Sequence, residues 1–373
     1  MKKLDRRAWL RTASLTSAFS LMGGLQAIQA HDDTPPQIAA KTRDAIARLS
    51  SNENPFGPSP KVRQAMTEAF DLGCRYPFSY AGELTKMIAE KEGVTPDHIV
   101  LTSGSTEGLK ATGLAFGLYG AEIVSAAPTY LSLLSYAEQF GAYIHKVPLD
   151  DGLGHDLDAM EKRINHKTSL VFICNPNNPT GTILPAQQLR DFCNSVSSRA
   201  MVFVDEAYFD YIEEPYPSMV EMVKQDKNVI VSRTFSKVYA LAGIRMGYLI
   251  ARPDIANRIE QNRMSMLNIM AIYAAKAALT DEAFYKDCLA KNSAAKALIY
   301  ETLDDLKLRY IPSHANFVFF HTGRDIKTVV ASMMEQGVSV GRPFPPLTDW
   351  CRISTGTMED VKKFTKGLRK MMV

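Results

Sequence analysis

Between residues 99 and 251 the sequence alternates short apolar runs, typical of buried β-strands, with stretches that have the spacing of amphipathic helices. We expect strands at 99–102, 122–126, 143–147, 169–174, 201–205, 229–232 and 248–251. Strands separated by helices are joined by crossover connections, which place neighbouring strands parallel and cover the sheet with helices. The sequence therefore predicts an α/β fold whose large domain holds a mainly parallel mixed sheet flanked by helices.

The rest of the sequence indicates how the chain is divided. With 373 residues it is long enough for more than one domain. We interpret 1–30 as a leader, 31–60 as a polar, proline-rich arm and 61–252 as the large domain. From about residue 253 the pattern becomes helical, and it ends in strands near 317–320, 338–340 and 351–354. We therefore expect a smaller α+β C-terminal domain over 253–373, with a ligand cleft between the domains.

The leader resembles an export signal of the twin-arginine type. Its basic start contains the pair Arg6 and Arg7, a mildly apolar run follows, and the small residue Ala30 suits cleavage. Such a leader predicts export of the folded protein to the periplasm. Serines, a threonine and two glycines interrupt the apolar run, so we do not expect a stable membrane span. The alternative is a cytoplasmic protein with a helical N-terminal extension.

The charge and the cysteines of the chain argue against a nucleic-acid partner, a disulfide framework and a metal site. The first thirty residues carry five basic side chains and one acidic side chain, more than the whole chain's net charge of +3, so the remainder is slightly acidic. Nothing in that balance indicates a nucleic-acid partner. The five cysteines are scattered and form no CxxC pair. We expect buried thiols, with neither a disulfide framework nor a metal site.

One lysine in the stretch 232–245 has surroundings that suit covalent chemistry. Lys237 follows the hydroxyl residues Thr234 and Ser236, and Arg245 comes eight residues later. An amine that attacks a carbonyl must be neutral, which a cationic or apolar setting favours. Hydroxyls and an arginine nearby can hold a phosphate. The pattern suits a Schiff-base lysine with the phosphorylated aldehyde pyridoxal phosphate, and the alternative is a surface lysine after a strand.

Three polar residues follow two other predicted strands. Asp205 ends the run 201–205, and a carboxylate at the carboxyl end of a parallel strand faces the ligand crevice. It could pair with the ring nitrogen of pyridoxal phosphate, while Tyr208 could donate to the ring's phenolic oxygen. Asn178 sits in a loop fixed by two prolines and a glycine, and its amide could serve the same oxygen. The alternatives are a strand-end cap and a structural turn.

Further candidates lie at the start of a predicted helix, after the predicted strand 122–126 and on the predicted strand 351–354. Gly104, Ser105 and Thr106 form a strand-to-helix turn whose free N–H groups could seat a phosphate, or they form a plain helix cap. Tyr130 could lie against a planar ring, although a core position is the common fate of tyrosine. Arg352 lies on a late predicted strand, where it could bind a carboxylate in a bidentate way or form a surface ion pair.

Four segments, 52–57, 175–181, 205–208 and 236–245, occur in the order found in the class I/II aminotransferases of fold type I. The chain resembles this family, and within it the histidinol-phosphate aminotransferase branch, from about residue 50 to its C-terminus. The resemblance implies pyridoxal 5'-phosphate as the cofactor and transfer of an amino group between an L-amino acid and a 2-oxo acid. It also implies a homodimer.

The resemblance also assigns roles by position. Lys237 would form the Schiff base and shuttle the proton, Asp205 would pair with the pyridine nitrogen, and Asn178 and Tyr208 would hold the phenolic oxygen. Tyr130 would stack on the ring. The phosphate would be held by Gly104, Ser105, Thr106, Thr234, Ser236 and Arg245, with Tyr76 contributed by the partner subunit. Arg352 and Asn54 would bind the substrate.

The sequence departs from the branch in two places that bear on the substrate. A methionine-rich segment, 263–268, replaces the proline–aromatic pair usual between the domains, and Gly341 precedes Arg342 where an arginine usually follows the strand directly. Methionines suit an adaptable apolar pocket, so Met264, Met266, Met270, Phe344 and Trp350 could line a pocket for an aromatic or large apolar side chain, and the alternative is that they are ordinary core. The alternatives are histidinol phosphate, decarboxylation or elimination on the same scaffold, and an exported solute-binding protein.

Overall fold

The computed structural model describes residues 46–372, which lie in one compact unit, Ala45–Val373. The predicted leader, residues 1–30, and residues 31–45 of the predicted arm lie outside the described residues. Among residues 46–372, no helix has the length and apolar character needed to cross a bilayer.

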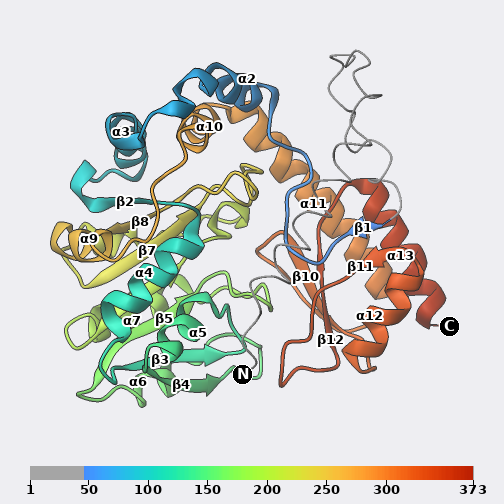
Figure 1. The fold of residues 1–373 in the computed structure, drawn as a ribbon. Coiled ribbons are helices and arrows are strands. Elements are labelled where there is room, and N and C mark those ends of the chain that lie inside the picture. The colour runs from blue at the N-terminus through green and yellow to red at the C-terminus, as the bar shows by residue number, and fades with distance from the viewer. Residues whose placement is uncertain (1–45, 373) are drawn as a thin grey trace, which may run out of the picture. The chain divides into compact units, whose positions relative to one another are not determined.

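A seven-stranded sheet forms the centre of the large α/β part, in the strand order β2-β8-β7-β6-β5-β3-β4 (Figure 1). Its strands are β2 (Ile99–Thr102), β3 (Glu122–Ala127), β4 (Tyr143–Pro148), β5 (Thr168–Cys174), β6 (Met201–Asp205), β7 (Val229–Thr234) and β8 (Gly247–Ala251). The pairs β3–β4, β3–β5, β5–β6 and β6–β7 are parallel, and β8 runs antiparallel to both of its neighbours. The predicted mainly parallel mixed sheet is confirmed.

Helices cover both faces of this sheet, which explains why its strands read as continuous apolar runs. One face packs against α4 (Ser105–Gly117), α5 (Ser132–Gln139) and α9 (Pro253–Glu260), and the other packs against α3 (Ala81–Glu92), α6 (Leu157–Glu161), α7 (Ala186–Val196) and α8 (Val220–Val223). Side chains alternate between the two faces: Phe172 and Phe203 stack on the first, whereas Val171 and Val202 point to the second.

A second, three-stranded antiparallel sheet lies in the C-terminal part, in the order β12-β10-β9. It consists of β9 (Tyr310–Ile311), β10 (Phe317–His321) and β12 (Trp350–Ser354), with helices α11 (Glu282–Asp305), α12 (Ile326–Glu335) and α13 (Met358–Met372) packed nearby (Figure 1). The predicted strand near 338–340 does not join this sheet. It forms β11 (Val338–Ser339), which pairs in parallel with β1 (Ala47–Arg48). Ala47 and Leu49 are therefore buried in the core, although their segment was interpreted as an arm.

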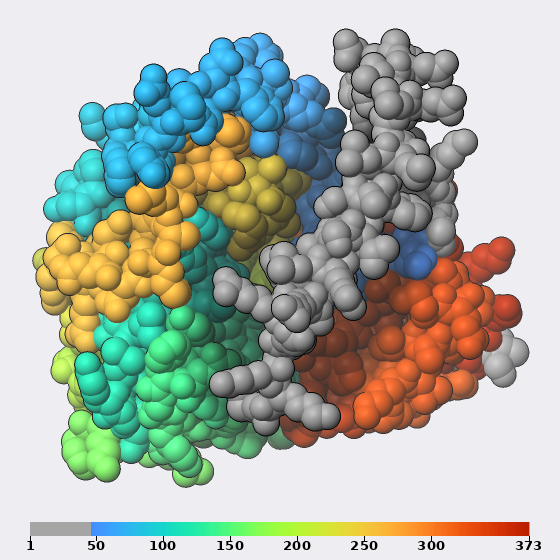
Figure 2. Space-filling view, in the orientation of Figure 1, coloured from blue at the N-terminus to red at the C-terminus, as the bar shows by residue number. Residues whose placement is uncertain are grey.

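Two helices beyond residue 252 pack against the large α/β part. Helix α9 contacts α4 and β2, and α10 (Ile269–Leu279) contacts α3 and α2 (Pro60–Glu68). Figure 2 shows the same contact as the blue segment of α2 beside the orange segment of α10. The chain therefore stays packed against the large α/β part after residue 252, until it enters α11. The predicted domain boundaries themselves stay a prediction.

The cysteines depart from expectation at one position. Four are buried, but Cys74 is exposed because it ends a short surface 3-10 helix, η1 (Phe70–Cys74). Within residues 46–372 no three His, Cys, Asp or Glu side chains are grouped so that they could hold a metal ion.

Candidate active site

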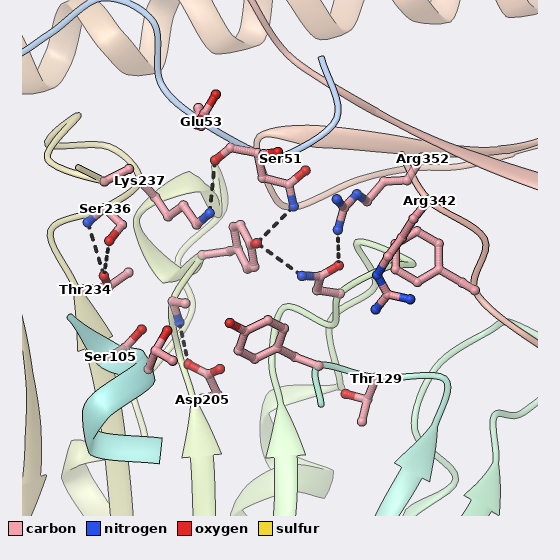
Figure 3. A pocket seen from close by; sticks show the side chains of 18 of the residues that line it. Ser51, Glu53, Ser105, Thr129, Asp205, Thr234, Ser236, Lys237, Arg342 and Arg352 are labelled. Carbon is pink, nitrogen blue, oxygen red and sulfur yellow. Dashed lines mark hydrogen bonds between the residues drawn. The ribbon is translucent and has the colours of Figure 1, made fainter. Parts of the chain in front are cut away.

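A cavity of about 330 Å³ lies at the carboxyl ends of β5, β6 and β7, where it is bordered by the start of α4, the segment 51–53 and strand β12. It brings together most of the predicted site residues. Those lining the cavity are Ser105, Thr106, Tyr130, Asn178, Asp205, Tyr208, Thr234, Ser236, Lys237, Arg245 and Arg352. Figure 3 shows Lys237 and Arg352 at opposite sides of the cavity, with Asp205 nearer to the sheet. This is the position in which open α/β sheets bind ligands.

Lys237 follows β7, and its side chain reaches into the cavity. Its Nζ donates to the backbone carbonyl oxygen of Asn52 at 3.0 Å and lies 5.3 Å from the centre of the Tyr208 ring. Burial, assisted by the positive charge of Arg352, lowers the pKa of Lys237 to about 8. A useful fraction of the amine is therefore neutral near pH 7 to 8, as a nucleophilic lysine requires.

Asp205 is the last residue of β6 and is only 2% exposed. One of its oxygens, Oδ1, accepts a hydrogen bond from the backbone N–H of Ala207 at 3.3 Å. Burial raises the pKa of Asp205 to about 7. A buried carboxylate is costly unless it meets a cation, so this one fits a ligand that carries a positive charge at the bottom of the cavity.

Tyr208, Asn178 and Arg352 form a chain of hydrogen bonds across the cavity. Arg352 donates through Nη1 to Asn178 Oδ1 at 2.6 Å, and Asn178 donates through Nδ2 to the Tyr208 hydroxyl at 3.3 Å. Burial raises the pKa of Tyr208 well above its usual value, so the hydroxyl keeps its proton. We expect Asn178 to bind the phenolic oxygen of the cofactor. Its amide also donates to the Tyr208 hydroxyl and so helps to orient that side chain.

The start of α4 forms a positive, hydroxyl-rich cradle. No side chain caps this helix, which leaves its first N–H groups free, and the Thr234 hydroxyl donates to the Ser236 hydroxyl at 3.0 Å. Gly104 has a left-handed φ of 81°, and a Cβ there would lie 2.2 Å from Arg245 Nη2. Only glycine therefore lets the guanidinium lie over the helix start. These features fit the phosphate of pyridoxal phosphate.

Arg352 and Arg342 add two guanidinium groups on the side of β12. Arg352 is 7% exposed and also donates through Nη2 to the carbonyl oxygen of Ser50 at 2.7 Å. Arg342 donates to the carbonyl oxygen of Pro343 at 3.0 Å, and its guanidinium lies 4.5 Å from the centre of the Phe344 ring. Among residues 46–372 neither arginine has a carboxylate partner. Unpaired arginines at a cavity favour an anionic ligand.

Two predicted residues lie elsewhere. The Nδ2 of Asn54 donates to the carbonyl oxygen of Val238 at 2.9 Å, so the side chain is used in fixing the loop after Lys237 and does not line the cavity. Tyr76 is 72% exposed and does not reach the cavity of its own chain. Its predicted role requires a second subunit.

The predicted methionine-lined pocket is wrong for the described chain, because Phe344 is the single member of that set at the cavity. Met264 and Met266 are 54% and 55% exposed, since Ser265 between them is bonded to Glu107 through both its N–H and its hydroxyl. Trp350 is buried and stacks on Phe319 with ring centres 5.0 Å apart.

Sequence reasoning missed several residues that line the cavity, namely Ser51, Asn52, Glu53 and Thr129. For two of them a sequence pattern exists that could have identified them. Asn52 and Glu53 begin the segment 52–57, which is one of the four segments that carry the family resemblance. Their roles follow from hydrogen bonds that no sequence pattern displays.

The fold and the lysine–aspartate cavity define a pyridoxal-phosphate-dependent enzyme of fold type I. The family model for aminotransferase class I and II matches residues 44–368, and the chain belongs to this family. It is therefore a pyridoxal-phosphate-dependent transaminase, and the solute-binding alternative is wrong.

Several named relatives are similar over most of their length. Histidinol-phosphate aminotransferase 1 of Bacillus cereus is 37% identical over 331 residues, which is 88% of this chain and 89% of the relative. Histidinol-phosphate aminotransferase of Moorella thermoacetica is 39% identical, with 88% and 86% covered. The crystal structure of histidinol-phosphate aminotransferase from Sinorhizobium meliloti in complex with pyridoxal-5'-phosphate has a TM-score of 0.82 at 26% identity, covering 94% of this chain and 99% of that one.

Proposed function

We propose that the amino donor of this transaminase is a small primary amine that carries a phosphate, with histidinol phosphate as the representative substrate. The observation that carries the proposal is the pair of cavity-lining arginines, Arg342 and Arg352, without a carboxylate partner among the described residues. A phosphate dianion can accept from two guanidinium groups, whereas an α-carboxylate carries one negative charge. The names of the relatives support the same substrate class.

A second candidate is an aromatic or large apolar L-amino acid, paired with a 2-oxo acid. The ring of Phe344 lines the cavity and supports this candidate, with Arg352 then binding the α-carboxylate. The predicted export of the protein also favours it, because an exported enzyme would be separated from cytoplasmic phosphate esters.

A panel of single half-reactions distinguishes the two candidates. Cofactor-loaded protein is mixed with histidinol phosphate, L-phenylalanine or L-leucine, and loss of the cofactor's visible absorbance is followed. We expect histidinol phosphate to react fastest. Arg342→Ala should slow that reaction by about 10- to 100-fold, which corresponds to one hydrogen bond to a charged group, and should change the L-phenylalanine reaction little. Arg352→Ala should impair both.

Arg324→Ala is the matched control, because it removes an exposed arginine outside the cavity. It should leave all three reactions unchanged. If L-phenylalanine reacts fastest and Arg342→Ala affects neither substrate, the phosphate-bearing donor is refuted and the second candidate stands.

We also propose that the enzyme is a homodimer in which Tyr76 reaches the phosphate of the partner's cofactor. Phe70 and Phe78 are 64% and 75% exposed on two adjoining 3-10 helices, η1 and η2 (Pro77–Ser79), and Tyr76, between the two helices, is 72% exposed. Exposed aromatic groups of this kind mark protein interfaces, and Tyr76 does not reach its own cavity. Sedimentation at micromolar concentration should give the mass of two chains, and the mass of one chain would refute the proposal.

We propose separately that the leader exports the folded enzyme to the periplasm. This proposal concerns where the enzyme acts, whereas the first concerns which amine the cavity binds, and each has its own test. The basis is the Arg6–Arg7 pair ahead of a mildly apolar run. Replacing both arginines with lysine keeps the charge but removes the paired guanidinium groups. The full-length variant should then remain in the cytoplasm, as measured by fractionation, whereas the unaltered chain should appear in the periplasm. An unchanged distribution would refute the role of the pair.

A further inference from the structure

Asn52 lies at the wall of the cavity, at a junction between the two sheets. It is 1% exposed and has a left-handed φ of 54°, a conformation that asparagine tolerates better than most residues. Its backbone N–H donates to the Ser354 hydroxyl at 2.8 Å, and the Ser354 hydroxyl donates to Asn52 Oδ1 at 2.9 Å. Ser354 belongs to β12, so Asn52 is fixed from the side of the three-stranded sheet.

The other polar atoms of Asn52 point to the catalytic side chains. Its Nδ2 donates to the Tyr208 hydroxyl oxygen at 2.9 Å. Its backbone carbonyl oxygen accepts from Lys237 Nζ and from Asn316 Nδ2, both at 3.0 Å. One residue therefore contacts both Lys237 and Tyr208.

The hydrogen bonds around Tyr208 determine where its proton can go. The phenolic oxygen accepts from Asn52 Nδ2 at 2.9 Å and from Asn178 Nδ2 at 3.3 Å, so both neighbouring amides present N–H groups to it. Neither amide can turn over without loss, because Asn52 Oδ1 accepts from Ser354 and Asn178 Oδ1 accepts from Arg352. The Tyr208 proton therefore cannot point at either amide and is left to donate elsewhere, and Tyr208 lines the cavity.

We propose that Asn52 is a positioning residue that directs the Tyr208 proton into the cavity, toward the phenolic oxygen of bound pyridoxal phosphate. A fixed donor stabilises the negative charge of that oxygen. The inference concerns the cofactor and does not depend on which amine the enzyme uses. Asn52 would therefore direct the Tyr208 proton with every substrate, including one that does not contact Asn52.

The test is a spectrophotometric pH titration of the cofactor-loaded protein without any amino substrate. Loss of a donor to the phenolic oxygen raises the pH midpoint at which the visible band changes. Tyr208→Phe should raise the midpoint by about one to two pH units, the equivalent of one hydrogen bond to a charged oxygen. Asn52→Gly, which keeps the left-handed backbone accessible, should raise it by about 0.5 to 1 unit because the Tyr208 proton is then free to turn away.

The decisive comparison is the double variant. If Asn52 acts through Tyr208, adding Asn52→Gly to Tyr208→Phe should move the midpoint by less than about 0.3 unit beyond Tyr208→Phe alone. Ser354→Ala tests the same effect of Asn52 on Tyr208 without altering either residue. It removes the hydroxyl that donates to Asn52 Oδ1, so the Asn52 amide can turn. It should give a smaller rise in the same direction that also disappears in the Tyr208→Phe background.

Two results would overturn the proposal. One is an unchanged midpoint in both Asn52→Gly and Ser354→Ala proteins that retain a full complement of cofactor. The other is a shift from Asn52→Gly that persists undiminished in the Tyr208→Phe background, because that result would assign the effect to general loosening of the site. Should Asn52→Gly fail to fold, the proposal is decided by Ser354→Ala alone and in the Tyr208→Phe background. A shift that persists undiminished in that background, or no shift at all, would overturn it.

Discussion

Replacing Lys237 with alanine is expected to abolish amino transfer while leaving the fold intact. Lys237 is the lysine of the cavity, and burial beside Arg352 lowers its pKa to about 8, so it can serve as both nucleophile and proton carrier. Alanine removes both functions, and we expect a loss of more than about 10⁴-fold in the single-turnover rate with any donor. The measurement is the decay of the cofactor's visible band, alongside circular dichroism and a melting curve.

Lys291→Ala provides the control. Its Nζ forms a surface pair with Asp287 at 2.6 Å, and such pairs contribute little to stability or function. That variant should retain full activity. A Lys237→Ala protein that turned over at a rate within tenfold of the parent would contradict the assignment.

Replacing Asp205 with asparagine is expected to cost about 4 to 7 kcal/mol of transition-state stabilisation, or roughly 10³- to 10⁵-fold in rate. The cofactor's ring accepts electrons best when its nitrogen is protonated, and a buried carboxylate at the bottom of the cavity favours that proton. Asparagine has the same shape but no charge. Asp210→Asn is the matched control, because Asp210 accepts from Tyr285 and does not line this cavity.

Asp205→Asn should slow the reaction, but it should stabilise the cofactor-free protein against unfolding. Burial raises the pKa of Asp205 to about 7 from an ordinary value of 3.8, so the folded state binds more protons than the unfolded state between these values. Stability of the cofactor-free protein should therefore fall as the pH rises through this window. At pH 8 Asp205→Asn should raise its melting temperature. A lower melting temperature together with near-normal turnover would refute the account of Asp205.

Much of the large domain could be predicted because its strands, except the edge strand β4, are buried on both faces and so stand out as apolar runs. The site could be predicted for a related reason, since Asp205 ends one strand, Asn178 and Lys237 follow two others, and the carboxyl ends of these strands meet at one edge. Sequence order and sheet geometry together place such residues in one cavity.

The parts that could not be predicted depend on contacts between distant segments. Strand β1 has two residues and no periodicity, so its pairing with β11 leaves no local signal. The role of Asn52 depends on hydrogen bonds to residues 156 to 302 positions away in the sequence. The exposed positions of Met264 and Met266 follow from the bonds between Ser265 and Glu107, which composition does not reveal.

The most direct test of the central claim is to trap the bond between cofactor and protein. The yellow, cofactor-loaded enzyme is reduced with borohydride and digested, and the labelled peptide is identified by mass spectrometry. We predict a single phosphopyridoxyl label on Lys237. A label on any other lysine, or no label on a protein that binds pyridoxal phosphate stoichiometrically, would contradict the account.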